Sequence, residues 1–314
     1  MICQICEKNT NRTIADTLRD GAKRKVFFCP HCELGILDSD KTEKELKKFY
    51  ASQYRAIGKP KLASISNPKE LFEIYSRFQD ARLRLLKPYF NKNKKLLEVG
   101  CSAGMFLWHA KKSVGETVGI DFDSKSAKFA AEKCDIKTYI TDITETPLRK
   151  NYFDIIAAFQ TLEHVKNPID FIGKHATYLK KDGVMAIEVP NLYDSLAHIY
   201  NLPNHYKFFY HSAHLWYFTE KSLLELMKKC GLVGKVFHIQ DYNILNHMNW
   251  LLNDRPQQDC LPGLSAPVLP IKKTTAPKIY ASLNKFIIET DKKYKNLLAK
   301  MKITSNMLFV GQKQ

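Results

Sequence analysis

Two pairs of cysteines near the start of the chain have the residue type and spacing of a metal site. Cys3 and Cys6 form one C-x2-C pair, Cys29 and Cys32 form another, and 22 residues separate the pairs. Zinc prefers four soft ligands in a tetrahedron, and each C-x2-C turn presents two thiolates without strain. Four protein ligands leave no open position for catalysis, so the pattern predicts structural zinc. His31 lies inside the second pair and is expected to be a turn residue.

The other four cysteines are scattered singly, at Cys101, Cys134, Cys230 and Cys260. This distribution favours a reducing compartment with one metal site over a disulfide framework. The chain has no apolar run long enough to span a bilayer, and its start lacks the charged and apolar regions of a signal peptide. The sequence therefore predicts a cytoplasmic protein.

A glycine-containing loop indicates a second kind of chemistry. Residues 94–104, KKLLEVGCSAG, read as a short apolar strand that enters a turn of small residues. Gly100 and Gly104 would let a ligand approach the backbone where a Cβ would obstruct it. A second apolar segment ends at Asp121, 17 residues after Gly104, and a third brings Asp142 to the same edge. A carboxylate at that spacing can accept hydrogen bonds from ribose hydroxyls, so the pattern predicts a nucleotide-like cofactor.

Strand-like and helix-like segments alternate through the middle of the chain. The strand-like segments are KKLLEVG, TVGID, IKTYITDI, YFDIIAAF and GVMAIEVPN. Such alternation is typical of an α/β protein with a doubly wound parallel sheet, helices on both faces and a ligand at the carboxyl ends of the strands. A nicotinamide dehydrogenase is disfavoured, because the order G-x-G-x-x-G is absent.

These features together resemble the class I S-adenosylmethionine-dependent methyltransferases, over residues 94 to about 240 and the final strand. LEVGCSAG looks like the first motif of that family, with Ser102 where a glycine often stands, and FQTLEHVKNP is a further methyltransferase-like stretch. The resemblance implies a Rossmann-like sheet of seven strands in the order 3-2-1-4-5-7-6, with the last strand antiparallel. It also implies S-adenosylmethionine as the cofactor.

The resemblance assigns nine residues to the cofactor. Those implied to surround its methionine part are Glu98, Gly100, Ser102 and Gly104. Asp121 is implied to bind the ribose. The adenine is implied to contact Phe122, Asp142 and Ile143, and the sulfonium to face Gln160.

The segment 191–218 follows the fifth strand and is crowded with aromatic residues and histidines. Methyl transfer from a sulfonium is an in-line displacement, and a hydroxyl or enolisable carbon must also lose a proton. Histidine is the natural base near neutral pH. The candidates for catalysis are His214 and His211, followed by Tyr210, with His205 behind them and His164 expected mainly to organise its loop.

The cysteine pairs, the stretch CELGILDSDKTEKELKKFYASQY and the core together resemble one branch of the family. That branch includes C-methyltransferases of nucleotide-linked deoxysugars and enzymes of polysaccharide clusters. Their His-Glu-His-Leu motif reads SAHL here, so only His214 matches, and the missing carboxylate shifts the expectation from C-methylation towards O- or N-methylation. The predicted acceptor is a sugar or a similar polar small molecule, nucleotide-linked sugars included.

Five parts are expected along the chain. They are a zinc ribbon at 1–40, a helical lid or linker at 41–92, the core at 93–240 with the substrate segment 191–218, an insertion at 241–305, and the last core strand at 306–314. Within the insertion, a helix near 278–301 carries an apolar stripe that is expected to pack on the protein or on a second subunit. The residues of this stripe are Ile279, Leu283, Phe286, Ile287, Tyr294, Leu297 and Leu298.

The formal net charge of +17 keeps other partners open. Forty of the 49 basic residues are lysine, and residues 261–314 hold ten lysines against Glu289 and Asp291. A basic tail is a candidate for contact with phosphate, an acidic polymer or a membrane surface. An RNA base methyltransferase would suit the zinc module and the charge, but arginine is scarce. A non-catalytic binding protein is the remaining alternative, and the presence of Gly100 and Asp121 speaks against it.

Overall fold

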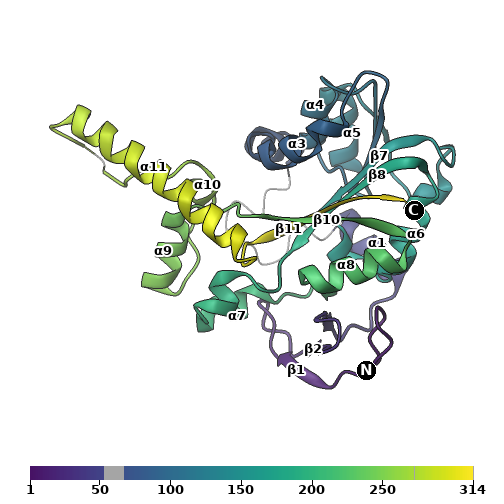
Figure 1. Ribbon diagram of the computed structural model, residues 1–314, viewed down its shortest axis with the longest axis horizontal. Coiled ribbons are helices and arrows are strands. Elements are labelled where there is room, and N and C mark those ends of the chain that lie inside the picture. The colour runs from purple at the N-terminus through teal and green to yellow at the C-terminus, as the bar shows by residue number, and fades with distance from the viewer. Residues whose placement is uncertain (53–66, 272, 314) are drawn as a thin grey trace.

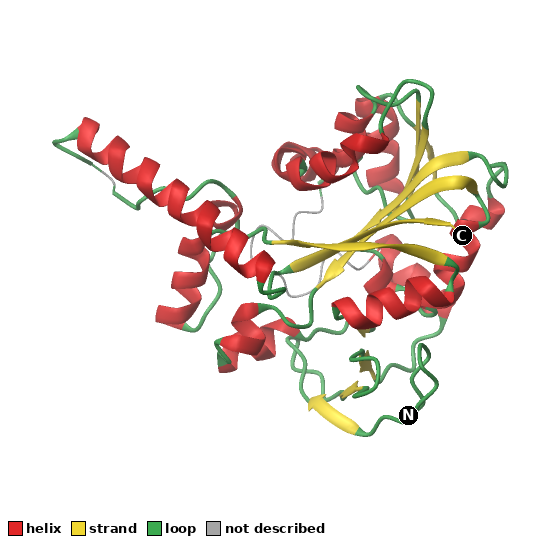
Figure 2. Cartoon of the chain, viewed as in Figure 1, coloured by secondary structure: helices red, strands yellow, loops and turns green. Residues whose placement is uncertain are grey.

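A seven-stranded mixed sheet forms the centre of the protein, with helices on both faces (Figures 1 and 2). The computed structural model describes residues 1–52, 67–271 and 273–313. Along the sheet the strand order is β10-β11-β8-β7-β4-β5-β6. The bounds of these strands are β4 Lys95–Val99, β5 Glu116–Ile120, β6 Lys137–Tyr139, β7 Phe153–Phe159, β8 Leu179–Pro190, β10 Leu232–Ile239 and β11 Asn306–Lys313.

The strand order confirms the expected topology. Numbered among themselves along the chain, the seven strands have the order 3-2-1-4-5-7-6. Strands β4 to β8 pair in parallel, whereas β11 is antiparallel to both β8 and β10. All seven residues of β7 are buried, as expected for a central strand that is covered on both faces. The carboxyl ends of the parallel strands therefore meet at one edge.

The helices bury their apolar residues in two hydrophobic clusters, one on each face of the sheet. One face is covered by α2 Pro68–Tyr75, α3 Asp80–Leu86, α4 Met105–Ala110 and α5 Ser124–Cys134. The other is covered by α1 Glu43–Ser52, α6 Pro168–Ala176 and α8 Glu220–Lys229. Helix α8 begins as its sequence predicts, because Thr219 and Ser222 form a capping box.

The segment between the cysteine pairs and the first core strand is more broken than its sequence indicates. The side chain of Asn67 caps α2 by accepting from the Lys69 amide, as expected for an Asn-Pro start. The stretch 67–90 reads as one helix from its sequence, but a 3-10 turn at Ser76–Phe78 interrupts it before α3 begins. The stretch 42–54 also reads as a helix from its sequence; it forms α1, and its last two residues lie outside the described chain.

The N-terminal cysteine-rich unit is joined to the core by a shared sheet. Its strands are β1 Arg12–Ala15, β2 Val26–Phe28 and β3 Gly35–Leu37, and β3 pairs with β9 Trp216–Tyr217 from the segment 191–218. The Leu37 amide also donates to the Leu215 carbonyl. The N-terminal unit is therefore attached to the two residues that directly follow His214.

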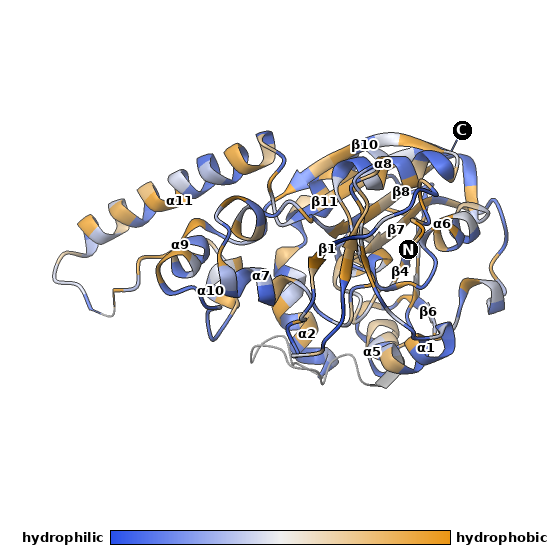
Figure 3. Cartoon of the chain, turned by 90° about the horizontal axis from the view of Figure 1, so that it is seen from below, coloured by the Kyte–Doolittle hydropathy of each residue, from blue (hydrophilic) through white to orange (hydrophobic). Residues whose placement is uncertain are grey.

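The region between β10 and β11 is helical and projects from the sheet (Figures 1 and 3). It contains α9 Ile244–Asn253, α10 Leu261–Leu264 and α11 Pro277–Lys300, close to the helix predicted near 278–301. Helix α7 Pro203–Phe209 and a π-helix at Ser195–Ile199 lie in the segment 191–218. None of the helices in the described ranges is both long and apolar enough to cross a bilayer.

The apolar stripe of α11 does not pack as a whole on the described chain. Leu298 is buried, and Ile287 and Tyr294 are half-buried. Ile279, Leu283, Phe286 and Leu297 are exposed. These four residues do not pack on the described chain, because the helix turns a neighbouring face towards α9 and β10, and the other expected contact, with a second subunit, stays a prediction.

Candidate active site

A cavity of about 1010 Å³ opens at the carboxyl ends of β4, β5 and β7. Eight of the nine residues predicted to bind the cofactor line it: Glu98, Gly100, Ser102, Asp121, Phe122, Asp142, Ile143 and Gln160. Gly104 lies behind the lining at the start of α4, with φ of 79°. A Cβ there would lie 2.9 Å from the Cβ of Ala130, so Gly104 allows α4 and α5 to pack closely.

The loop after β4 has a conformation that depends on its glycine. Gly100 has φ of 77°, and a Cβ on it would lie 2.4 Å from the Thr161 hydroxyl oxygen. The next small residue, Ser102, also has a positive φ of 49°. Its amide donates to Asp121 Oδ2 at 2.7 Å, which ties the loop to the end of β5. The backbone is thus exposed to the cavity where a ligand could approach it.

Two carboxylates at neighbouring strand ends are held in position by backbone amides. Asp121 Oδ1 accepts from the Asp123 amide at 2.8 Å, and Asp142 Oδ1 accepts from the Thr144 amide at 3.0 Å. Burial acts to raise the pKa of Asp142, but the amide and hydroxyl of Thr144 donate to it and hold the pKa below its usual value. Both groups could accept hydrogen bonds from a nucleoside at this edge.

An ion pair between Arg82 and Glu188 lines the cavity beside the residues predicted to bind the cofactor. Arg82 of α3 donates from Nε to Glu188 Oε2 at 2.9 Å, and Gln160 Nε2 donates to Glu188 Oε1 at 3.0 Å. Glu98 is 4% exposed, and its Oε2 has no hydrogen-bond partner among the described residues. Burial raises the pKa of Glu98 well above its usual value, and the positive charge of Arg82 opposes that shift. Arg82 could hold a carboxylate of the cofactor.

Sequence reasoning did not select Arg82. The available signal was an arginine in the helix directly before the first core strand, among leucines that face the core. Its importance depends on Glu188, which lies 106 positions away along the chain. Only the folded sheet brings the two side chains together.

The histidines of the candidate catalytic group meet a carboxylate that the sequence did not predict. His214 Nε2 lies 3.9 Å from Glu163 Oε1, and His164 Nε2 lies 3.7 Å from the same oxygen. His164 Nδ1 is also within hydrogen-bond distance of the Ala213 carbonyl oxygen, at 2.8 Å, and of the Tyr50 hydroxyl. His164 and His214 line the cavity. The donor atoms of the three groups lie within 4.8 Å of one another, so a divalent cation could also bind here.

Glu163 lies behind these two histidines and is fully buried. Within the described ranges, neither of its carboxylate oxygens has a hydrogen-bond partner. Burial raises its pKa to about 8, Glu188 adds to that shift, and Arg82 opposes it. The Leu215 amide donates to the Glu163 carbonyl oxygen and so joins the two segments. The signal in the sequence was the acidic residue of LEHV, at the same edge as the histidine-rich segment.

The other two catalytic candidates lie away from the cavity lining. His211 packs its ring against His214, with 3.8 Å between the ring centroids. Tyr210 is buried among Tyr206, Phe209 and Tyr217, and burial raises the pKa of its hydroxyl far above the usual range. In this position Tyr210 does not line the cavity, and its catalytic role stays a prediction.

The exchange of Glu163 for glutamine tests the buried carboxyl. The folded protein keeps a proton that the unfolded chain loses above the ordinary pKa of 4.5, so the free energy of unfolding falls as pH rises from there to about 8. Glu163→Gln removes this effect and should be more stable than the parent at pH 7 by about 1 to 3 kcal/mol. Thermal unfolding from pH 5 to pH 8 measures the difference. Parallel curves for the two proteins would contradict it.

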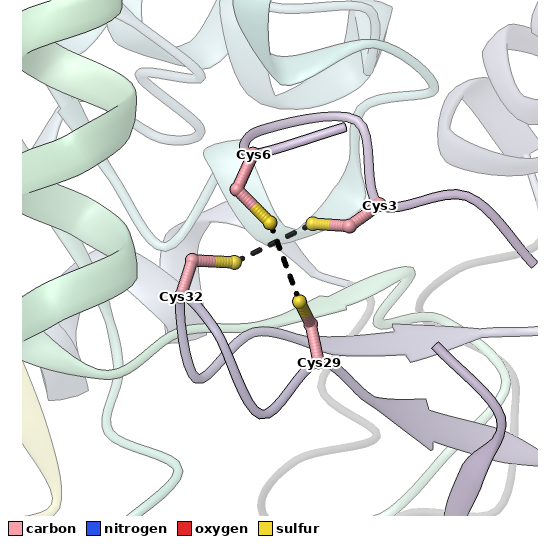
Figure 4. A group of neighbouring side chains, drawn as sticks. All are labelled: Cys3, Cys6, Cys29 and Cys32. Carbon is pink, nitrogen blue, oxygen red and sulfur yellow. Dashed lines mark hydrogen bonds between the residues drawn. The ribbon is translucent and has the colours of Figure 1, made fainter. Parts of the chain in front are cut away.

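The four cysteines of the N-terminal pairs face one another (Figure 4). The Sγ atoms of Cys3 and Cys32 are 3.4 Å apart, as are those of Cys6 and Cys29. All four sulfurs lie within 4.8 Å of one another. Zinc–sulfur bonds of about 2.3 Å in a tetrahedron separate the sulfurs by about 3.8 Å, so a zinc ion fits among them with small shifts. His31 is exposed and does not belong to the group.

Comparison with known proteins gives a consistent picture. Residues 71–234, just over half of the chain, match the model of a methyltransferase domain family. A protein of Pelagibacter ubique (strain HTCC1062) named ubiquinone biosynthesis O-methyltransferase is 32% identical over 172 residues, which cover 52% of this chain and 71% of that protein.

A protein of the same name from Actinobacillus pleuropneumoniae serotype 7 (strain AP76) is 31% identical over 108 residues. That match covers 31% of this chain and less than half, 46%, of the relative. Among solved structures, a SAM-dependent methyltransferase from Archaeoglobus fulgidus aligns with a TM-score of 0.51 at 19% identity, over 78% of this chain and 97% of its own. This last likeness supports the fold alone.

Proposed function

We propose that this chain, which belongs to the methyltransferase family and is an S-adenosylmethionine-dependent methyltransferase, methylates a hydroxyl oxygen. The proposed acceptor is a small polar molecule, and the proposed base is His214. The observation that carries the proposal is the buried Glu163 carboxyl behind His214 at the cavity wall. A carboxyl group behind a histidine orients the ring, and its ionised form stabilises the protonated histidine. The family assignment contradicts the alternative of a non-catalytic binding protein.

The proposed roles divide between the two sides of the cavity. S-adenosylmethionine, when bound, supplies an electrophilic methyl group, and Asp121, Asp142 and Arg82 are proposed to hold its ribose, adenine and carboxylate. On the acceptor side, His214 takes the hydroxyl proton on the ring nitrogen that faces away from Glu163. The acceptor oxygen would then supply the electron pair for the new bond to the methyl carbon, while the carbon–sulfur bond of the cofactor would break and leave its electron pair on sulfur.

The aromatic part of the cavity lining favours an acceptor that contains a ring. Phe208, Phe209 and Trp250 line it, together with Arg19 and His205. His205 is 7% exposed, its Nδ1 has no hydrogen-bond partner in the described part of the chain, and burial lowers its pKa to about 3. It is therefore a neutral polar group against aromatic walls, which suits a ring that bears hydroxyls.

A sugar, including a nucleotide-linked one, has the hydroxyls and the apolar ring face that such walls accept. The resemblance of residues 1 to about 240 to sugar methyltransferases supports this class. A phenolic acceptor is the second candidate, because the named relatives are O-methyltransferases of ubiquinone biosynthesis. The RNA reading has less support, because a base methyltransferase is expected to present arginines and this chain has nine against forty lysines.

Turnover of methyl-labelled S-adenosylmethionine tests these classes directly. The panel contains nucleotide sugars, dihydroxybenzoates and bulk RNA, each at low and high salt and with or without added Mg²⁺ or Mn²⁺. Label on a sugar oxygen is the expected result. Label on a phenol would retain His214 as the proposed base and change the acceptor class. Salt-sensitive label on RNA would overturn the small-molecule proposal. Label on carbon would contradict O-methylation.

We further propose that the four cysteines bind one structural zinc ion and thereby hold the segment that carries His214. The support is the sulfur geometry and the pairing of β3 with β9, which attaches the N-terminal unit beside that histidine. No catalytic role is proposed for the metal, because four thiolates leave no open position.

Replacing both Cys29 and Cys32 with serine should remove the metal and leave the cofactor region formed. We expect zinc content to fall from about one ion per chain to near zero, with S-adenosylmethionine affinity changed by less than about threefold. Turnover should fall, because the attachment beside His214 loosens. Cys230→Ser is the matched control and should keep its zinc. Full zinc occupancy in the double variant would rule out the four-cysteine site.

A further inference from the structure

Helix α11 exposes apolar side chains along one of its faces. Ile279, Leu283, Phe286, Leu297 and Met301, just beyond the helix end, are between 46% and 64% exposed. At 100° per residue these five positions lie within about 60° of one another. They therefore form one ridge along a helix of 24 residues, which is about 36 Å long. Figure 3 shows how far this helix extends from the sheet.

The ridge is not the face by which α11 packs on the protein. A neighbouring face makes those contacts: Asp291 accepts from the Ile244 amide at 2.7 Å, and the Tyr294 hydroxyl lies 2.7 Å from His247 Nδ1. Leu298 on the same face is buried. Helix α9 adds exposed apolar side chains to this region, with Leu252 76% exposed.

Lysines flank the ridge on the side opposite the packing face. They are Lys278, Lys285, Lys292, Lys293 and Lys300, all exposed. The helix holds six lysines and two acidic residues, Glu289 and Asp291, a net charge of +4, and it contains no arginine. Asp291 is buried on the packing face, so Glu289 alone offsets the lysine side.

A second copy of this chain is a poor partner for such a face. Helices that pack together lie 8 to 10 Å apart, which is about one Debye length at physiological salt. A dimer through the ridge would therefore bring two helices of net charge +4 together with little screening. Charge complementarity favours an anionic partner, and the large aliphatic and aromatic side chains favour one with an apolar interior.

We propose that α11 docks on an anionic lipid surface and lies in the plane of the interface. The ridge enters the boundary of headgroups and acyl chains, while the lysines remain at the level of the lipid phosphates. Contact of this kind is peripheral. It brings the methyltransferase to a membrane surface whatever its acceptor is.

Co-sedimentation with lipid vesicles tests the proposal in the full chain. The protein should bind vesicles that contain phosphatidylglycerol and phosphatidylcholine, bind pure phosphatidylcholine at least roughly tenfold more weakly, and be released by salt. The double variant Leu283→Asp with Phe286→Asp should lose binding by roughly tenfold or more. The pair Lys285→Glu with Lys292→Glu should weaken binding and reduce its salt dependence.

Two matched controls change the same residue types elsewhere. Val233→Asp alters an exposed apolar residue of β10, and Lys181→Glu alters an exposed lysine of β8; both should bind like the parent. All variants should keep the parent affinity for S-adenosylmethionine, which separates this proposal from that of the methyl-transfer site. Unchanged vesicle binding by the double variant would overturn the proposal. The proposal would also be overturned if the parent protein did not bind vesicles and sedimented as a dimer while the double variant sedimented as a monomer.

Discussion

His214→Ala should lower the turnover number by about 100- to 1000-fold, the range expected when a positioned general base is lost. The histidine lines the cavity, and the buried Glu163 carboxyl lies 3.9 Å behind it. The affinity for S-adenosylmethionine should change by less than about threefold, because the residues proposed to hold the cofactor lie on the other side of the cavity. Initial rates at saturating cofactor, with the affinity measured by calorimetry, separate the two effects.

The pH profile distinguishes a base from a packing residue. The parent should lose activity at low pH as its base is protonated, and the variant should lack this limb and regain part of its rate with added imidazole. His198→Ala, an exposed histidine of the same segment, is the control and should behave like the parent. Equal turnover in His214→Ala and the parent would move the role to another residue. Lower turnover with an unchanged pH profile would indicate a structural role.

Asp121→Ala should weaken the binding of S-adenosylmethionine by about 100-fold. Hydrogen bonds to a charged group contribute about 1.5 to 3 kcal/mol each, and a ribose offers two hydroxyls to this carboxylate. The carboxylate also accepts from the amides of Ser102 and Asp123, so its loss loosens the loop that faces the cofactor. Titration calorimetry with the cofactor and with S-adenosylhomocysteine measures the effect.

Asp121→Asn separates the loss of hydrogen bonds to the ribose from the loosening of the loop. Its side-chain oxygen can still accept one amide and keep the loop in place, so the loss of affinity should be about tenfold rather than 100-fold. Asp182→Ala changes an exposed residue of β8, controls for removal of a negative charge and should bind like the parent. If Asp121→Ala binds the cofactor as tightly as the parent, the ribose assignment is falsified.

Much of the core could be predicted because its determinants are local. Strand β4 and its loop lie within KKLLEVGCSAG, and Asp121 follows at a short spacing, so neighbouring residues along the chain define that edge of the site. The strand order was predicted by resemblance and is confirmed. The two C-x2-C pairs likewise predict the sulfur cluster, because each turn fixes its own two ligands.

The polar pairs within the cavity could not be predicted, because they join segments that are distant in sequence. SAHL lacks the carboxylate of the related motif, yet the fold places Glu163, some 50 positions earlier, behind His214. In the same way Arg82 meets Glu188 across two elements. Tyr210 illustrates the converse, since its type suits catalysis but its neighbours bury it.

The sequence by itself determined the small-residue turn after the first core strand, the place of Asp121 and the cysteine cluster, since spacing and periodicity along short segments set the geometry of each. The fold family was predicted by resemblance. Only the tertiary structure decided which side chains share the acceptor side of the cavity and which face of α11 is exposed. The apolar period of that helix shows a stripe, but a period carries no information on what lies opposite it. Here α9 and β10 contact the neighbouring face, and the ridge of Ile279, Leu283 and Phe286 stays exposed.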